Sequence, residues 1–277
     1  MAVEVARYWR HAAVEGVDLL QARYLTHRYG RHAHETYTFG LIEAGVEEFE
    51  YGGSLLRASA GAVALLDPDV VHTGQAATPA GWSYRVLYPK VSVVKDVAAD
   101  LGWPAGTPRF PQTVLHDATT AALLRSAHQA AEYGDQLASS TLLRTALAGL
   151  LRAHAAAGPS LSPVPARTAP AAIRAVRELL HERLADPPTL AELAAMAELS
   201  QFALLRAFRA ATGLPPHAYL NQVRVRQARL LLDAGVPAAD VAGQIGFADQ
   251  AHLTRHFKRV VGVPPAAYQR ERLRSAS

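Results

Sequence analysis

The chain has 277 residues, half of them hydrophobic, and this length and composition favour two domains that each bury a core. The absence of cysteine excludes disulfides and thiolate metal sites, and no signal peptide or membrane span is evident, so we expect a cytoplasmic protein without a membrane partner. Lys and Arg outnumber Asp and Glu by 14 to 9 from Ala171 onward but stand at 14 to 15 before it, which marks the rear part as a candidate nucleic-acid module.

Residues 1 to about 90 are expected to form mainly β-structure. Short runs of Val, Leu, Ile, Tyr and Phe stand between turns rich in Gly, Pro and Asp, which is typical of a β-sandwich or a β-barrel. A turn at Gly45 would separate two of the strands. The expected strands cover residues 18–26, 36–43, 46–51, 54–58, 62–66 and 83–88.

From about residue 91 the apolar residues recur with a helical period. The sequence predicts helices over residues 91–101, 117–133 and 136–154. A stripe as broad as that of the last helix either packs on the barrel or is shared with a second subunit, so a second copy of the chain is one candidate partner. The stripe consists of Leu142, Leu143, Ala146, Leu147 and Leu150.

Three histidines are the most chemically informative side chains of the front part. His32 and His34 share one face of an extended segment, because side chains alternate along a strand, and His72 comes from a later segment. With Tyr37 and Arg85 they are candidates for the wall of a ligand pocket in the mouth of a barrel. Three roles stay open for the histidines: binding a small molecule, structural residues with backbone partners, or ligands of zinc, nickel or iron.

The residues that follow the predicted helices are expected to form a linker. Residues 155–170 are rich in Pro, Ala and Ser and show no core-forming pattern. We therefore expect one domain over residues 1–155, a linker over residues 156–170 and a second domain over residues 171–277. The second domain is expected to begin with a helix at residues 173–184.

The segment 238–268 has the pattern of two short helices around a tight turn. Gly246 suits the turn because glycine enters the left-handed backbone region without a Cβ penalty, and Asp249 is placed to cap the second helix. An apolar stripe in the second helix is expected to be buried, and its small, polar and cationic front suits the major groove of DNA. The stripe is Leu253, Phe257 and Val260, and the front is Ala251, Thr254, Arg255 and Lys258.

The same unit occurs earlier in the chain. The residues 200–219 match the residues 249–268 at an offset of 49, which indicates a duplicated supersecondary unit. Thr189 and Glu192 have the spacing of a capping box for the helix before the earlier copy. The front of the earlier helix carries Phe202, Leu205, Arg206 and Arg209.

The segment VAGQIGFADQAHLTRHFKRVVGVPPAAYQ, residues 241–269, resembles the DNA-binding region of the AraC/XylS family of bacterial transcription regulators. The resemblance implies two helix-turn-helix modules joined by a long helix, here residues 217–232. Glu198 replaces the family's usual glycine, and a left-handed backbone there would cost about 1 kcal/mol. Carried onto matching positions, the resemblance implies base contacts by Phe202, Leu205, Arg206, Gln250, Ala251, His252, Thr254 and Arg255.

The segments HAHETYTFGLIEAG and GAVALLDPDVVHTG resemble the two cupin half-motifs, as they occur in the effector-binding domain of the same family. Metal-binding cupins carry a glutamate shortly after the histidine pair, and here that position falls on Thr38. The resemblance implies an α+β protein of two domains. A cupin-like β-barrel followed by helices would precede an all-α domain with two helix-turn-helix motifs.

The function implied by the resemblance is that of a transcription regulator, of the activator type, which binds double-stranded promoter DNA. A small-molecule effector in the barrel would control it, and RNA polymerase and a homodimer are further implied partners. We expect no cofactor and no enzymatic activity. Two alternatives stay open: a metal-dependent cupin enzyme fused to a DNA-binding module, and a DNA-binding protein whose front domain only dimerises.

Overall fold

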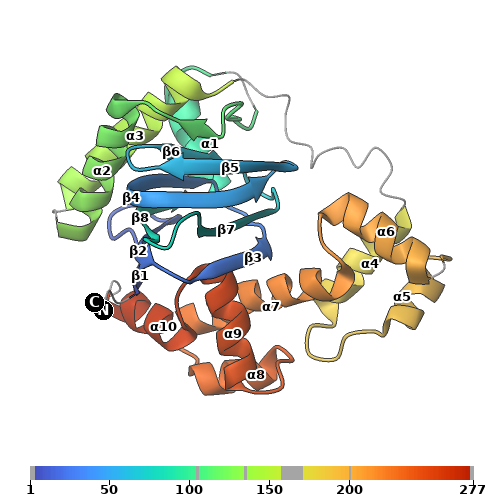
Figure 1. The fold of residues 1–277 in the computed structure, drawn as a ribbon. Coiled ribbons are helices and arrows are strands. Elements are labelled where there is room, and N and C mark those ends of the chain that lie inside the picture. Colours follow the sequence, from blue (N-terminus) through green and yellow to red (C-terminus); the bar gives the residue numbers. More distant parts are fainter. Residues whose placement is uncertain (1–3, 104–105, 134–135, 157–170, 200, 275–277) are drawn as a thin grey trace. The chain divides into compact units, whose positions relative to one another are not determined.

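The computed structural model describes residues 4–103, 106–133, 136–156, 171–199 and 201–274. They fall into two compact units, residues 4–156 with 270–274 and residues 171–269. The first is built around a sheet and the second from helices alone (Figure 1). Most of the expected linker, residues 157–170, lies outside the described residues, while Ala156 forms a β-bridge with Arg109. No described helix is long and apolar enough to cross a membrane.

The first unit begins with eight strands in succession, interrupted only by turns. The strands are β1 (Val5–Arg10), β2 (Val17–Tyr24), β3 (Arg28–His32), β4 (Thr38–Tyr51), β5 (Ser54–Ser59), β6 (Val63–Leu66), β7 (His72–Ala76) and β8 (Trp82–Pro89), and the short β9 (Val114–Leu115) comes later. The helices are α1 (Val91–Asp100), α2 (Ala118–Tyr133) and α3 (Gln136–His154). All three helices agree with the sequence prediction to within one residue at each end.

Strand β4 belongs to both halves of the barrel. Its first half pairs with β6 and β8, and its second half pairs with β5 and β7. The change of pairing partners occurs at Gly45, which has φ +73°. Gly45 approaches Gly81 so closely that any Cβ on it would collide with the carbonyl oxygen of Gly81. The prediction of a turn between two separate strands was therefore wrong: the chain bends at this glycine and continues as one strand.

The sequence did not predict β1, β3, β7 or β9. Strand β3 has the sequence RYGRH and β7 the sequence HTGQA, and neither contains the run of β-branched residues that normally indicates a strand. Pairing holds them in place instead, since β3 pairs with β7 and β7 with β4. These two polar strands carry His32 and His72, and His34 lies just after β3.

The sheet of β1, β2, β8, β4, β6 and β9 has two different faces. Phe39 and Leu41 of β4 and Leu87 of β8 point to the side covered by the helices, where they join one core. Thr38 and Gly40 lie on the opposite face of β4 and line a cavity, as the alternation of side chains along a strand requires. In α3 the side chains of Leu143, Ala146, Leu147 and Leu150 are buried in the same core, so this part of the stripe packs on the barrel.

The second unit contains the repeated helices. They are α4 (Ala171–Glu182), α5 (Leu190–Met196), α6 (Gln201–Thr212), α7 (Pro216–Asp233), α8 (Ala238–Gln244) and α9 (Gln250–Val261), followed by α10 (Pro265–Arg274). The expected long helix at residues 217–232 is α7, and the first helix of the unit starts two residues before its predicted start at 173. The fold class expected from the sequence, a barrel-like sheet domain with helices and then an all-α domain with two helix-turn-helix motifs, is confirmed.

The two copies of the repeat have the same packing. Leu204 and Phe208 of α6 are fully buried, as are Leu253 and Phe257 of α9. The Phe208 ring meets Tyr219 edge-on with centroids 5.4 Å apart, and the Phe257 ring meets Tyr268 edge-on at 5.3 Å. The last buried position of α9 is Val261, however, and Val260 is only half-buried, because the buried residues of this helix follow one another at intervals of four.

Candidate ligand cavity and DNA-binding helices

The barrel of the first unit encloses a cavity of about 40 Å³. A typical small-molecule pocket has about 300–1,000 Å³. The residues that line it are Tyr29, His32, His34, Thr38, Gly40, Glu47, Phe49, Ala64, Leu66, His72, Thr73, Tyr84, Val86 and Tyr88. None of these residues is a lysine or an arginine. A larger hollow lies between the loops 25–28 and 76–79, but none of the predicted site residues lines it.

The three predicted histidines meet in this cavity. One nitrogen from each of His32, His34 and His72 lies within 4.8 Å of the other two. His32 of β3 and His72 of β7 are direct cross-strand partners, and their ring centroids are 4.3 Å apart. The His34 ring stands 4.8 Å from that of His32 and 5.1 Å from that of His72.

The backbone fixes the orientation of these rings. His32 Nδ1 donates to the Gly30 carbonyl at 2.7 Å, and His72 Nδ1 donates to the Val70 carbonyl at 2.9 Å. In a neutral imidazole whose Nδ1 carries the proton, Nε2 carries the lone pair. The carbonyl of His34 accepts from the backbone N–H of Asp69, at 2.7 Å.

The turn that holds His34 is itself strained. Asp69 has φ +61°, a left-handed conformation that a residue with a side chain adopts at a cost of about 1–2 kcal/mol. Its backbone N–H nevertheless ties the turn before β7 to the segment after β3. The strained turn therefore helps to set the distance between His34 and His72.

The titratable groups of the cavity are shifted towards their neutral forms. Burial lowers the pKa of His72 to about 4 and holds the pKa of His32 well below its usual range. Burial also raises the pKa of Glu47, the only carboxyl group in the cavity wall, to about 8. Glu47 is half-buried in the cavity wall, and no described residue forms a hydrogen bond or an ion pair with its carboxyl group.

A cluster of tyrosines completes the wall beside Glu47. The Tyr29 hydroxyl lies 2.7 Å from the hydroxyl of Tyr84 and donates to the hydroxyl of Tyr24 at 3.2 Å. Burial raises the pKa of Tyr29 and of Tyr84 well above the usual range, so both stay protonated. The cavity wall is thus mostly apolar and carries three imidazoles, tyrosine hydroxyls and a single carboxyl group.

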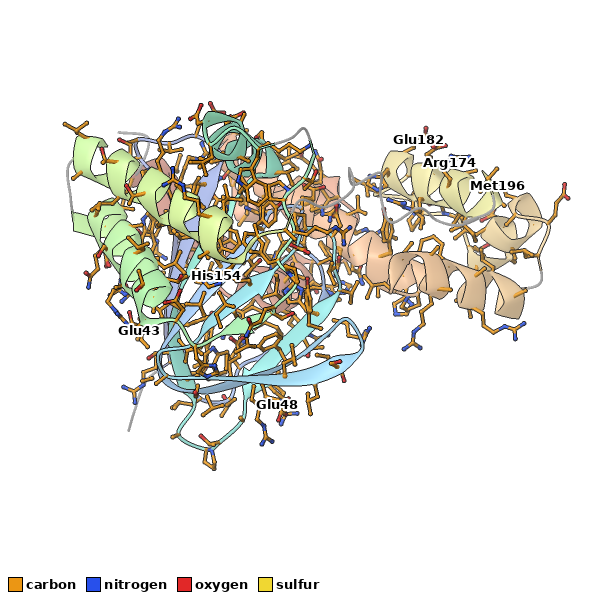
Figure 2. All side chains as sticks on the ribbon, turned by 90° about the horizontal axis from the view of Figure 1, so that it is seen from above. Glu43, Glu48, His154, Arg174, Glu182 and Met196 are labelled. Atoms are coloured by element: carbon orange, nitrogen blue, oxygen red, sulfur yellow. The ribbon has the colours of Figure 1, made fainter. Side chains whose placement is uncertain are left out.

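Two of the predicted pocket residues lie elsewhere. Tyr37 is fully buried in the core under the helices, where its hydroxyl donates to the Pro108 carbonyl at 2.5 Å. Arg85 lies on the helix-facing side of β8 and pairs with Glu43 at 3.2 Å and with Glu132 of α2 at 3.0 Å (Figure 2 labels Glu43). Arg85 alternates along β8 with Tyr84 and Val86, which line the cavity, and Tyr37 directly precedes Thr38, which also lines it, so both residues point away from the cavity. Both are therefore corrections to the predicted pocket.

The front of α9 has the character predicted for a DNA-binding helix. Asp249 caps the helix by accepting from the backbone N–H of His252 at 2.6 Å. The side chains of Gln250, Ala251 and Arg255 are exposed, and those of Thr254, Lys258 and His252 are half-buried. All six residues belong to α9, and Ala251 and Arg255 lie on the side of the helix opposite the buried Leu253 and Phe257.

His252 also contacts the protein. Its ring lies 5.1 Å from Phe247 in the turn and 4.8 Å from His256. The His256 ring in turn stacks on Phe247. His252 is therefore held against the turn rather than projecting freely from α9.

The predicted DNA-facing side of α6 is also at least partly accessible. Arg206 and Arg209 are exposed, and Leu205 is half-buried. Phe202 belongs to α6, but its side chain lies outside the described residues. The helix before it, α5, starts with the predicted capping box, in which Thr189 and Glu192 each bond the other's backbone N–H.

The turns of the two modules differ in one residue type. Gly246 has φ +80°, and a Cβ there would come within 2.7 Å of Ala185 and of Arg224. At the equivalent place, two residues after the end of α5, Glu198 adopts φ +53°. Glu198 therefore has the left-handed backbone whose cost the sequence analysis considered, and the first turn carries a strain that the second avoids.

Comparison with protein families identifies both units. An AraC-like ligand binding domain matches residues 16–151, and a helix-turn-helix domain matches residues 193–271. The chain belongs to the AraC family of transcription regulators. It is a DNA-binding regulator with an N-terminal ligand-binding domain, as the resemblance of its motifs implied.

Several AraC-family and related regulators are similar in sequence. YbfI, an HTH-type transcriptional regulator of Bacillus subtilis, is 28% identical over 238 residues, which cover 86% of each chain. An AraC-like transcription regulator of Streptomyces antibioticus is 31% identical over 60% of this chain and 54% of its own length. MtrA of Neisseria gonorrhoeae is 32% identical over 33% of this chain and 32% of its own.

Solved structures show the same fold. Apo ToxT from Vibrio cholerae covers 93% of this chain and 98% of its own, with a TM-score of 0.59 at 14% identity. ToxT with a bound unsaturated fatty acid covers 96% of this chain and 94% of its own, with a TM-score of 0.53 at 14% identity. At this identity the likeness concerns the fold alone.

The sequence did not single out the other polar residues of the cavity in this AraC-family protein. Glu47 and Phe49 alternate with Glu48, which pairs with Arg57 on the opposite face of β4 (Figure 2 labels Glu48). A glutamate two residues before an inward phenylalanine was the available signal. It could not be used because the predicted break at Gly45 left the inward face of this segment undefined.

Proposed function

We propose that this AraC-family regulator reads DNA bases with the front of α9 and with the front of α6. The observation that carries the proposal is the repeated helix: the same buried pair, Leu–Phe, lies behind an exposed cationic front in both copies. The α9 contacts are Gln250, Ala251, His252, Thr254, Arg255 and Lys258, and those of α6 are Phe202, Leu205, Arg206 and Arg209. No described residue pairs with Arg255 or Lys258 in an ion pair, which leaves both charges available to DNA.

The test is selection of binding sites from random duplex DNA with the full chain. A regulator with two reading helices is expected to enrich a site with two conserved segments about one helical turn apart. Substituting Arg255 should erase the preference in one segment only. Enrichment of no sequence at all, by a folded protein that still binds DNA, would contradict base reading by these helices.

We further propose that the barrel cavity is the site of the small ligand. Its support is the meeting of His32, His34 and His72 in one cavity, whose wall also contains the carboxyl group of Glu47. The lining lacks the lysine or arginine that a fatty carboxylate would need, so the ligand is expected to differ from that of ToxT. Melting of the full chain with fatty acids, cations and metabolites tests this, since a ligand at 100 times its dissociation constant adds about 2.7 kcal/mol.

The proposed role of this cavity is binding and not catalysis. A cavity of about 40 Å³ has room for an ion or for a few atoms, but not for an organic substrate beside a metal ion. This observation favours a regulator over the alternative of a metal-dependent cupin enzyme. Turnover of any added cupin substrate by the metal-loaded protein would reverse that assignment.

The proposed domain limits are residues 1–155 and 171–277, joined by a linker at residues 156–170. Limited proteolysis should cut first in the linker, since the composition there forms no core. We also propose a cytoplasmic activator that acts with RNA polymerase as a homodimer. Light scattering of the full chain tests the dimer.

A further inference from the structure

We propose that His32, His34 and His72 bind one divalent transition-metal ion, such as zinc, and that this ion is the ligand of the barrel. The inference rests on the proposed role of the cavity and names the chemical class that fits it. Its basis is the convergence of three imidazoles from two paired strands and one anchored turn.

The distances suit closure on an ion. Nitrogen ligands about 2.0–2.1 Å from a tetrahedral zinc ion stand about 3.4 Å apart. The three histidine nitrogens already lie within 4.8 Å of one another. Small rotations of the imidazole rings would bring the nitrogens to the spacing that a zinc ion requires. His34, the half-buried member, has the most room to move.

The hydrogen bonds that would orient two of the three ligands are also in place. Histidines that bind metals usually donate the other ring N–H to a carbonyl or a carboxylate, which fixes the ring and its tautomer. His32 and His72 do this through Gly30 and Val70. The same bonds could serve two merely structural histidines, but they do not account for a third ring brought up against both.

The charge of the cavity favours a cation. Three neutral imidazoles leave the full charge of the ion in a wall that contains no lysine or arginine to repel it and one carboxyl group, that of Glu47. Imidazole ligands without thiolate suit zinc, nickel, copper or iron, and the chain has no cysteine to offer. Three protein ligands also leave a coordination position for water or another donor.

The experiment measures metal uptake by the full chain after dialysis against a chelator. We expect one Zn²⁺ per chain by elemental analysis. Bound Co²⁺ should give the visible absorption of a site with low coordination number. His34→Gln should weaken Co²⁺ binding at least 100-fold, because it removes a ligand at the least buried position. His116→Gln, at an exposed histidine away from the cavity, is the matched control and should change nothing.

Two results would overturn the proposal. One is the absence of Zn²⁺ and Co²⁺ uptake by the folded wild-type chain; the other is equal Co²⁺ affinity in wild type and a folded His34→Gln variant. If His34→Gln does not fold, Thr38→Asp provides a second test. The variant adds a carboxylate to the wall of the cavity that holds the three histidines, so it should tighten Co²⁺ binding and change the Co²⁺ spectrum. An unchanged Thr38→Asp spectrum would count against the site.

DNA binding is measured on the same samples. If metal binds but the protein selects no DNA sequence, the proposed base reading fails and the metal site stands. If sequence-selective DNA binding persists without any metal uptake, the metal site fails and the regulator stands. The two proposals can therefore fall separately.

Discussion

At the scale of single residues, Glu47 makes stability depend on pH. Its folded pKa of about 8 lies above the usual value of 4.5, so its stabilising contribution is fully present below about pH 4.5 and is lost as pH rises through 8. With chelator present, the melting temperature of Glu47→Gln should therefore be close to that of wild type at pH 5. It should exceed that of wild type by a growing margin as the pH rises to 8.5. Melting curves across this range give the measurement.

The neighbouring Glu48 is the matched control. It lies on the other face of β4, where hydrogen bonds from Gln75 and Arg57 lower its pKa. Glu48→Gln should show no growing advantage at alkaline pH. A constant difference between Glu47→Gln and wild type at all pH values would show that the carboxyl group of Glu47 is already ionised.

Glu198 is the second residue whose effect can be calculated. Its left-handed backbone costs about 1–2 kcal/mol relative to glycine. Glycine, however, has more conformational freedom in the unfolded chain, which offsets about 0.5–1 kcal/mol of the gain from substituting it. Glu198→Gly should therefore raise the free energy of unfolding by about 0.5–1 kcal/mol in urea titrations. Glu192→Gly, which breaks the capping box of the same module, should lower it. A loss of stability in Glu198→Gly would mean that the Glu198 side chain has a favourable contact.

At the scale of elements, α9 separates base reading from general affinity. An arginine on the exposed front can bond guanine with two hydrogen bonds, worth about 1–3 kcal/mol of discrimination. Arg255→Ala should weaken the selected site much more than scrambled DNA. Lys258→Ala should weaken both alike and make the log-log salt slope shallower by about one unit. Titrations of both DNAs over a salt series give the comparison.

Two controls accompany that comparison. Arg174→Ala removes the same charge from an exposed position of α4 and should leave the preference intact (Figure 2 labels Arg174). Phe257→Ala should cost about 3–5 kcal/mol of stability, since it opens a cavity behind α9. Equal losses on both DNAs for Arg255→Ala would assign that residue to the phosphates and move base reading to Gln250, His252 or Thr254.

Strand β4 carries the corresponding prediction for the barrel. Gly45→Ala adds a Cβ where the backbone of Gly81 already lies, and it also places a side chain at φ +73°. We expect a loss of more than about 3 kcal/mol, or failure to fold, by thermal and urea unfolding. Gly52→Ala is the control: its φ is also positive, but a Cβ there meets nothing within 4 Å, so only the smaller backbone cost remains.

At the scale of the whole molecule, local signals predicted the second unit better than the first. The cap at Asp249, the glycine at Gly246 and the repeated Leu–Phe pair act within a few residues, so the sequence located the helices and their faces. The prediction that Val260 is buried was the exception, because the neighbouring Val261 continues the buried stripe of Leu253 and Phe257 instead.

The first unit depends on contacts between distant segments. The approach of Gly45 to Gly81 and the pairing of two polar strands cannot be seen in either segment alone. Consequently the histidines were predicted to converge, whereas Tyr37 and Arg85 were assigned to the cavity although both point to the side of the sheet that the helices cover. Glu47 was missed for the same reason, since its inward direction follows from the continuity of β4.

The pairing of His32 with His72 has a further consequence, which concerns chain topology. An ion held by both would be a removable cross-link closing a loop of about 40 residues, a constraint that in a disulfide of this span is worth about 4 kcal/mol of unfolded-chain entropy. The chain has no cysteine, so coordination is the cross-link open to it. Removing the ion would then loosen β3 and β7 together and leave the core beneath the helices intact.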